Sequence, residues 1–127
     1  METRILVVDD SSVVRRMLSR ALEATGDIRV CATAANGRIA LQKVKTDPPD
    51  LIILDLDMPE MDGLETLEEL GRSYPSIPVI MFSVLTERGA QATLQALFRG
   101  AQDYVTKPSG AANSEEAVQR VQDQLIP

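Results

Sequence analysis

Four aspartates stand where two apolar runs of the sequence end. Asp9 and Asp10 follow the run ILVV. Asp55 follows the run LIIL, and Asp57 comes two residues later. Carboxylates about 4 Å apart repel one another by about 4 kcal/mol per pair at an effective dielectric of about 20. Such a cluster persists where positive charge offsets the repulsion, and a divalent cation held by oxygen ligands would supply that charge.

A hydroxyl and an amine follow two later apolar runs. Ser83 comes directly after the run VIMF, and Lys107 comes directly after DYVT. Mg²⁺ prefers one or two carboxylates, retained waters and a phosphate oxygen, and a carboxylate can be the nucleophile that forms an aspartyl phosphate. Asp55 follows the most apolar run, so it is predicted to lie at the sheet centre and to carry a phosphoryl group. Ser83 and Lys107 are then expected to contact phosphate oxygens.

The elements that must position these side chains are strands and helices in alternation. Short runs rich in apolar and β-branched residues predict strands that are buried on both faces. Between them apolar residues recur at helical spacing, as at Val14, Leu18 and Leu22. The pattern predicts an α/β protein with a parallel sheet, whose carboxyl edge is where ligands bind. The predicted strands are Ile5 to Val8, Ile28 to Ala32, Leu51 to Leu54, Val79 to Phe82, and Asp103 to Val105.

Polar residues and glycines mark the expected ends of the helices. Short polar side chains are typical N-caps, and glycine is typical of the residue after a helix. Arginines on the first helix, Arg15, Arg16 and Arg20, are interpreted as part of a solvated face. The expected N-caps are Ser11 or Ser12, Thr86 and Ser114, and the glycines expected at helix ends are Gly26, Gly71 and Gly100.

The composition excludes several classes of function. A length of 127 residues predicts one domain, over residues 1–127. The single cysteine, Cys31, and the absence of histidine exclude an internal disulfide, a His-containing catalytic triad and a His-ligated metal. A net charge of −6 with only four aromatic residues argues against nucleic-acid binding. No apolar run is long enough for a membrane span or a signal peptide, so the cytoplasm is the expected compartment.

Taken together, these motifs resemble the receiver domain of two-component response regulators. The runs that carry the resemblance are ILVVDDS, ILDLDMPEMDG, VIMFS and GAQDYVTKP. The resemblance implies a flavodoxin-like (βα)5 fold, with a five-stranded parallel sheet of order 2-1-3-4-5 and helices on both faces. It also implies a phosphoryl-accepting signalling switch rather than an enzyme, with chemistry limited to phosphorylation and dephosphorylation of the chain itself.

The same resemblance assigns metal and acceptor roles. Asp55 matches the phosphoacceptor of the motif D-x-x-M-P-x-M-D-G. Asp9 and Asp10 match the acidic pair that holds Mg²⁺, and the main-chain carbonyl of Asp57 matches a further ligand of the ion. The implied cofactor is therefore Mg²⁺.

Further positions match the residues that sense the phosphoryl group. Ser83 matches the hydroxyl that contacts it, and Lys107 matches the family's lysine, with a cis bond expected before Pro108. Tyr104 matches the aromatic switch residue. The face made by the fourth helix (Glu87 to Arg99), the fifth strand and the last helix is expected to contact an output domain, a target protein or a dimer mate. Without histidine in the chain, the phosphoryl group must come from a sensor histidine kinase, a phosphotransfer protein or a small acyl phosphate.

One long segment resembles a particular group of receiver domains. SVLTERGAQATLQALFRGAQDYVTKPSG resembles the receiver of the chemotaxis protein-glutamate methylesterase. That enzyme carries a C-terminal catalytic domain, which this sequence lacks. The chain is therefore interpreted as a stand-alone receiver or as a regulatory fragment of a methylesterase.

Two rival functions fit parts of the sequence. LIILDLDMP also resembles the D-x-D motif of haloacid-dehalogenase-type phosphatases, but that motif normally opens its domain, whereas here a complete βαβα pattern precedes it. A pseudo-receiver that is never phosphorylated is the second rival, and the presence of Asp10, Asp55, Ser83 and Lys107 argues against it. An aspartate after a strand is by itself also typical of a turn or a helix N-cap; the combination favours the receiver.

Overall fold

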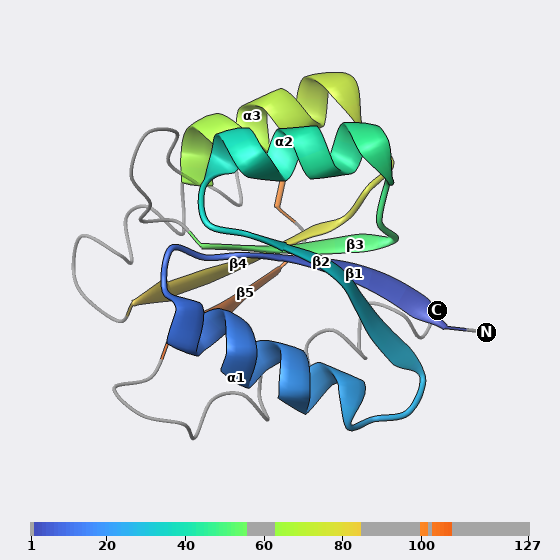
Figure 1. The fold of residues 1–127 in the computed structure, drawn as a ribbon. Helices are drawn as coiled ribbons and strands as arrows, with labels where there is room; N and C mark the ends of the chain where they lie inside the picture. The colour runs from blue at the N-terminus through green and yellow to red at the C-terminus, as the bar shows by residue number, and fades with distance from the viewer. Residues whose placement is uncertain (1, 56–62, 85–99, 102, 108–127) are drawn as a thin grey trace.

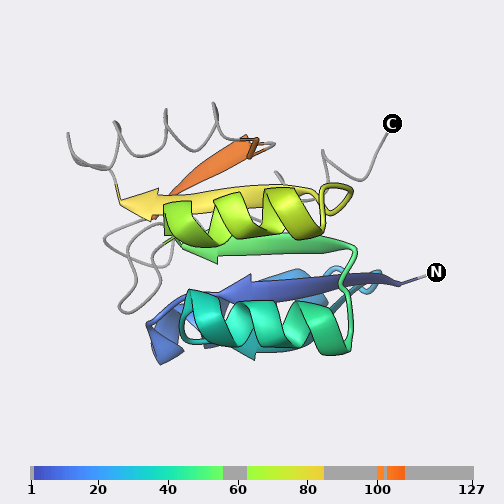
Figure 2. The same ribbon diagram turned by 90° about the horizontal axis from the view of Figure 1, so that it is seen from above.

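A five-stranded parallel sheet forms the centre of the structure. The computed structural model describes residues 2–55, 63–84, 100–101 and 103–107, and at residues 83, 84 and 103–107 it describes the backbone. The strand order is β2-β1-β3-β4-β5, with all neighbours parallel. Helices α2 and α3 cover one face and α1 covers the other (Figures 1 and 2). The elements are β1 (Thr3–Val8), α1 (Ser12–Glu23), β2 (Ile28–Ala34), α2 (Gly37–Thr46), β3 (Leu51–Asp55), α3 (Gly63–Ser73), β4 (Val79–Val84) and β5 (Asp103–Lys107).

This arrangement confirms the predicted fold class and strand order. The strand β1 shows why an unbroken apolar run predicted a buried strand. Leu6 and Val8 lie in the core cluster that α2 and α3 complete, whereas Ile5 and Val7 lie in a second cluster with α1. All four side chains are at most 1% exposed. Because both faces of the strand are buried, no polar position interrupts its apolar run.

The start of α1 agrees with the sequence prediction, whereas the end of α3 differs from it. Ser11 is the N-cap of α1, and its hydroxyl accepts a hydrogen bond of 3.3 Å from the Val14 amide. The expectation that Gly71 ends a helix is wrong, since α3 continues to Ser73 and the Tyr74 amide still donates to the Leu70 carbonyl at 2.7 Å. Pro75 follows and cannot continue the helical hydrogen bonding, so the helix stops there.

Two other glycines adopt the backbone conformation expected after a helix. Gly26, which follows α1, has φ of 86°, and Gly100 has φ of 111°. These angles lie in the left-handed region that favours glycine. The helices expected after Thr86 and after Ser114 lie outside the described residues. Among the helices that are described, none is long and apolar enough to cross a membrane.

A β-bulge interrupts the edge strand β2. Ile5 pairs with Val30 and Leu6 pairs with Ala32, so Cys31 is an extra residue on the β2 side. Its half-buried thiol donates to the Ile5 carbonyl at 3.5 Å. Burial raises the pKa of the Cys31 thiol more than the nearby Arg4 lowers it.

This environment predicts a slowly reacting thiol. Thiolate is the reactive form, and a raised pKa leaves less of it at neutral pH. Alkylation of Cys31 by iodoacetamide at about pH 7.5 is therefore expected to be slower in the folded chain than in the urea-unfolded chain. Mass spectrometry of quenched time points measures both rates. Equal rates in the two states would contradict the role of burial.

Candidate functional site

The carboxyl ends of β1 and β3 bring three aspartates together. Asp55 is the last residue of β3, and Asp9 directly follows β1. Val8 pairs with Leu54, so the two strands deliver Asp9 and Asp55 side by side. One carboxylate oxygen from each of Asp9, Asp10 and Asp55 lies within 4.8 Å of the others. We call these three residues the acidic site.

Burial and charge decide what the acidic site can hold. Asp9 and Asp55 are each 1% exposed, whereas Asp10 is exposed. Burial and close like charges both disfavour ionised carboxylates. A hard divalent cation offsets the charge and prefers oxygen ligands. The donor set therefore fits Mg²⁺, and the exposed Asp10 leaves a side through which a hydrated ion could enter.

Hydrogen bonds fix the turn that carries the acidic pair. The Asp9 amide donates to the Ala34 carbonyl at 3.0 Å, which ties the residue to the adjacent strand β2. The Ser11 amide donates to Asp9 Oδ1 at 2.9 Å, an Asx-type turn that short acidic side chains favour. Ser11 then caps α1. The sequence DDSS thus forms a fixed turn between β1 and α1.

Arg15 also belongs to this turn, and its interpretation as a solvated residue is wrong. The Arg15 side chain is partly buried, and its Nη1 donates to the Asp9 carbonyl oxygen at 2.7 Å. The available sequence signal was its position: the first turn of α1 holds no acidic residue, and a cation near a helix N-terminus opposes the helix dipole.

Ser83 and Lys107 stand at the same edge of the sheet by their backbone positions. Asp55 pairs with Phe82, so Ser83 is the next residue along β4. Lys107 is the last residue of β5 and pairs with Val84, whereas Tyr104 lies earlier on β5 opposite Met81. The topology therefore brings β3, β4 and β5 to one edge in the predicted order. Asp57, Pro108 and the predicted helix over residues 87–99 lie outside the described residues.

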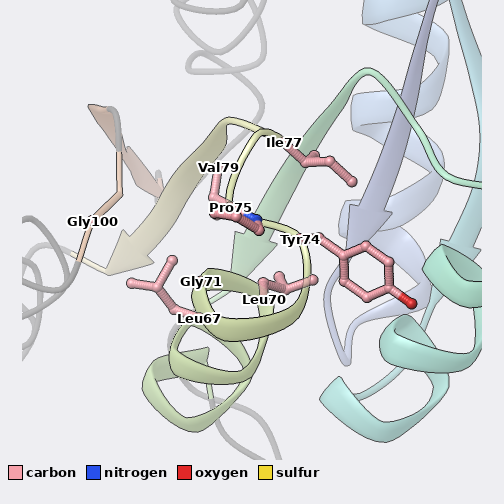
Figure 3. Close-up of a pocket in the computed structure, with 8 residues that line it drawn as sticks. All are labelled: Leu67, Leu70, Gly71, Tyr74, Pro75, Ile77, Val79 and Gly100. Atoms are coloured by element: carbon pink, nitrogen blue, oxygen red, sulfur yellow. The ribbon is translucent and has the colours of Figure 1, made fainter.

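A cavity of about 250 Å³ lies away from the acidic site (Figure 3). It is formed where α3 ends and β4 begins, at the amino end of β4, whereas the aspartates lie at the carboxyl ends of β1 and β3. Among the described residues that line it, none has a charged side chain. The described part of its lining therefore holds no carboxylate or amine of the kind that the acidic edge presents. Its lining residues are Leu67, Leu70, Gly71, Tyr74, Pro75, Ile77, Val79 and Gly100.

Comparison with known proteins identifies relatives of the whole chain. The response regulator receiver domain family matches residues 5–119. A protein-glutamate methylesterase/protein-glutamine glutaminase of Trichodesmium erythraeum is 52% identical over 124 residues, which are 98% of this chain and 35% of that protein. The protein of the same name from a Nocardioides species is 51% identical, over 98% of this chain and 34% of its own length. The chain thus spans about a third of the length of these relatives.

Solved structures share both the fold and part of the sequence. The response regulator domain of Thermotoga maritima CheB superposes with a TM-score of 0.85 at 34% identity, covering 98% of this chain and 94% of that one. A chain of the CheX–CheY–BeF3–Mg²⁺ complex from Borrelia burgdorferi gives 0.84 at 30% identity, covering 98% and 90%. With the family match over residues 5–119 and the sheet order found here, the chain belongs to the response regulator receiver domain family.

Proposed function

We propose that this receiver domain is a switch in which Asp55 accepts a phosphoryl group and the acidic site holds Mg²⁺. The observation that carries the proposal is the acidic site itself. Asp55 ends the central strand β3, is 1% exposed, and has a carboxylate oxygen within 4.8 Å of those of Asp9 and Asp10. A buried carboxylate beside two others is costly without a cation, and a bound cation would make the site a place for a phosphoryl group.

The reaction needs one bond to break and one to form. A carboxylate oxygen of Asp55 attacks phosphorus, the P–N bond of a phosphohistidine breaks, and the leaving imidazole takes up a proton. Asp9, Asp10 and the main-chain carbonyl of Asp57 are the proposed partners of the ion beside Asp55. Mg²⁺, when bound, supplies positive charge that offsets the charge of the transferred group.

Ser83 and Lys107 are proposed to complete the phosphoryl site. Both stand at the carboxyl edge, on β4 and β5, which follow β3 in the sheet. A hydroxyl and an ammonium group can donate charge-assisted hydrogen bonds to phosphoryl oxygens. Such a bond contributes roughly 1.5–3 kcal/mol, which shifts a two-state equilibrium by about tenfold to a hundredfold. That shift is enough for Ser83 to move and for Tyr104, on the neighbouring strand, to change its position.

The donor and the reader of the signal are proposed to be other proteins or domains. The chain has no histidine, so it cannot provide the phosphohistidine. We assign the donor role to a sensor histidine kinase or a phosphotransfer protein. The proposed output face combines β5 with the predicted helices after residues 86 and 114, which lie outside the described residues.

The relatives favour a place in chemotaxis for this receiver. They are protein-glutamate methylesterases that are 51–52% identical to the chain and about three times as long. We propose that phosphorylation of this domain controls a methylesterase, and that the chain by itself has no methylesterase activity. A receiver that acts alone on a separate target is the alternative.

Phosphorylation of the wild-type chain tests the proposal. Incubation with acetyl phosphate and Mg²⁺ should add one phosphoryl group, seen by intact-mass spectrometry and located to Asp55 by peptide mapping. Chelation of Mg²⁺ should prevent the addition, because the acidic site then repels the incoming anion. Addition to Ser83 or Ser11, or addition without metal, would contradict the mechanism. Continuous phosphate release from p-nitrophenyl phosphate would indicate a phosphatase instead.

A further inference from the structure

Arg15 connects α1 to the main chain of the acidic pair. Its guanidinium Nη1 donates to the Asp9 carbonyl at 2.7 Å, and its amide donates to the Ser11 carbonyl at 3.0 Å. The Ser19 hydroxyl in turn donates to the Arg15 carbonyl at 2.7 Å. Arg15 therefore closes the turn between β1 and α1 with both its backbone and its side chain.

Charge alone disfavours a cation at the position of Arg15. Arg15 lies near the positive end of the α1 dipole, which disfavours a guanidinium. Its hydrogen bond to Asp9 also places a positive charge next to the carboxylates that fit a divalent cation. Through space this charge repels such an ion. The function of Arg15 must therefore be sought in its hydrogen bond rather than in its charge.

The bonded carbonyl constrains the backbone position of Asp10. The Asp9 carbonyl belongs to the peptide unit that links Asp9 to Asp10, and a peptide unit is planar. A hydrogen bond that holds this oxygen holds the plane, and with it the positions of the Asp10 amide nitrogen and Cα, from which the Asp10 side chain extends. Asp10 is the exposed member of the acidic site, and it is not among the buried core residues of the part of the chain that the structure describes.

We infer that Arg15 is a positioning residue for Mg²⁺ binding, acting through the Asp9 carbonyl to hold Asp10 beside Asp55. The inference rests on the proposed function, in which the acidic site binds this ion. It assigns Arg15 no contact with the ion or with the phosphoryl group. Loss of an outer partner of a metal site lowers metal affinity by about 10- to 100-fold.

Two variants with the same charge change separate positioning from charge. Arg16 follows Arg15 on α1 and is exposed. Arg15→Gln is expected to raise the Kd for Mg²⁺ about tenfold, measured by isothermal titration calorimetry on the full chain. Arg16→Gln is expected to leave the Kd within about twofold of wild type, or slightly tighter, because exposed charges are screened by salt. A purely electrostatic role would make Arg15→Gln bind Mg²⁺ more tightly, which is the opposite sign.

Two further measurements distinguish a positioning role of Arg15 from a general loss of structure in the Arg15→Gln variant. Arg15→Lys retains a charged donor group but not the planar guanidinium, and it is expected to give a Kd between those of wild type and Arg15→Gln. In the wild-type chain, the Arg15 guanidinium protons should exchange slowly and shift on Mg²⁺ titration, whereas those of Arg16 should do neither. An Arg15→Gln Kd equal to or below wild type, or fast exchange at Arg15, would overturn the inference. A wild-type chain that does not bind Mg²⁺ would instead overturn the proposed function.

Discussion

Asp55→Asn is expected to abolish phosphoryl incorporation from acetyl phosphate in the presence of Mg²⁺. The amide that replaces the carboxylate has no anionic oxygen to attack phosphorus. Removal of an essential nucleophile lowers a rate by about a thousandfold or more. Intact-mass spectrometry over a time course measures the loss. The variant should remain folded, because asparagine has nearly the same size and its neutral side chain relieves repulsion from Asp9 and Asp10.

Asp27→Asn provides the matched control for this experiment. Asp27 is exposed and directly precedes β2, and its Oδ1 accepts a hydrogen bond of 2.7 Å from the Thr25 hydroxyl. An asparagine side-chain oxygen can still accept that bond. The control makes the same chemical change away from the acidic site, so it should be phosphorylated at the wild-type rate. A single phosphoryl group that persists in Asp55→Asn would show that another residue is the acceptor.

The sheet could be predicted because burial on both faces leaves a visible pattern. β1 and β3 appear in the sequence as unbroken apolar runs, and the rule that ligands bind at the carboxyl edge then places Asp9, Asp10 and Asp55 together. Features that depend on main-chain hydrogen bonds leave no such pattern in the amino-acid sequence. The bulge at Cys31 and the extension of β2 to Ala34 involve backbone groups that every residue carries.

The role of Arg15 was missed for the same reason. Its partner is the Asp9 carbonyl, and a backbone acceptor adds no recognisable residue to a motif. Spacing on α1 alone groups Arg15 with Arg16 and Arg20 as a solvated face. The end of α3 shows a related limit, because Gly71 is only a weak stop signal and helical hydrogen bonding continues past it to Tyr74. Local residue preferences thus identify elements better than they identify the last turn or the partner of a long side chain.

Asp10→Asn is expected to change metal affinity and metal-free stability in opposite directions. The variant removes one negative charge from the acidic site, so it should weaken Mg²⁺ binding by about 10- to 100-fold, the effect of losing one charge–charge attraction at a largely exposed position. The same change relieves repulsion between Asp10 and its buried neighbours Asp9 and Asp55 when no metal is present. The free energy of unfolding without metal should therefore rise by about 1 kcal/mol, which raises Tm by a few degrees.

Both effects can be read from one thermal-unfolding series. Wild type, Asp10→Asn and the control Asp27→Asn are unfolded over a range of Mg²⁺ concentrations. An ion that binds only the folded state raises Tm as its concentration increases. The Tm of wild type and of the control should therefore rise as Mg²⁺ is added. The Tm of Asp10→Asn should be higher than that of wild type in chelator and should change little with Mg²⁺. The plots of Tm against Mg²⁺ concentration should therefore converge or cross. A parallel response of all three proteins would show that Asp10 does not help to hold the ion. A lower starting Tm for Asp10→Asn would show instead that its carboxylate stabilises the metal-free fold, and that repulsion within the acidic site is already offset by other groups.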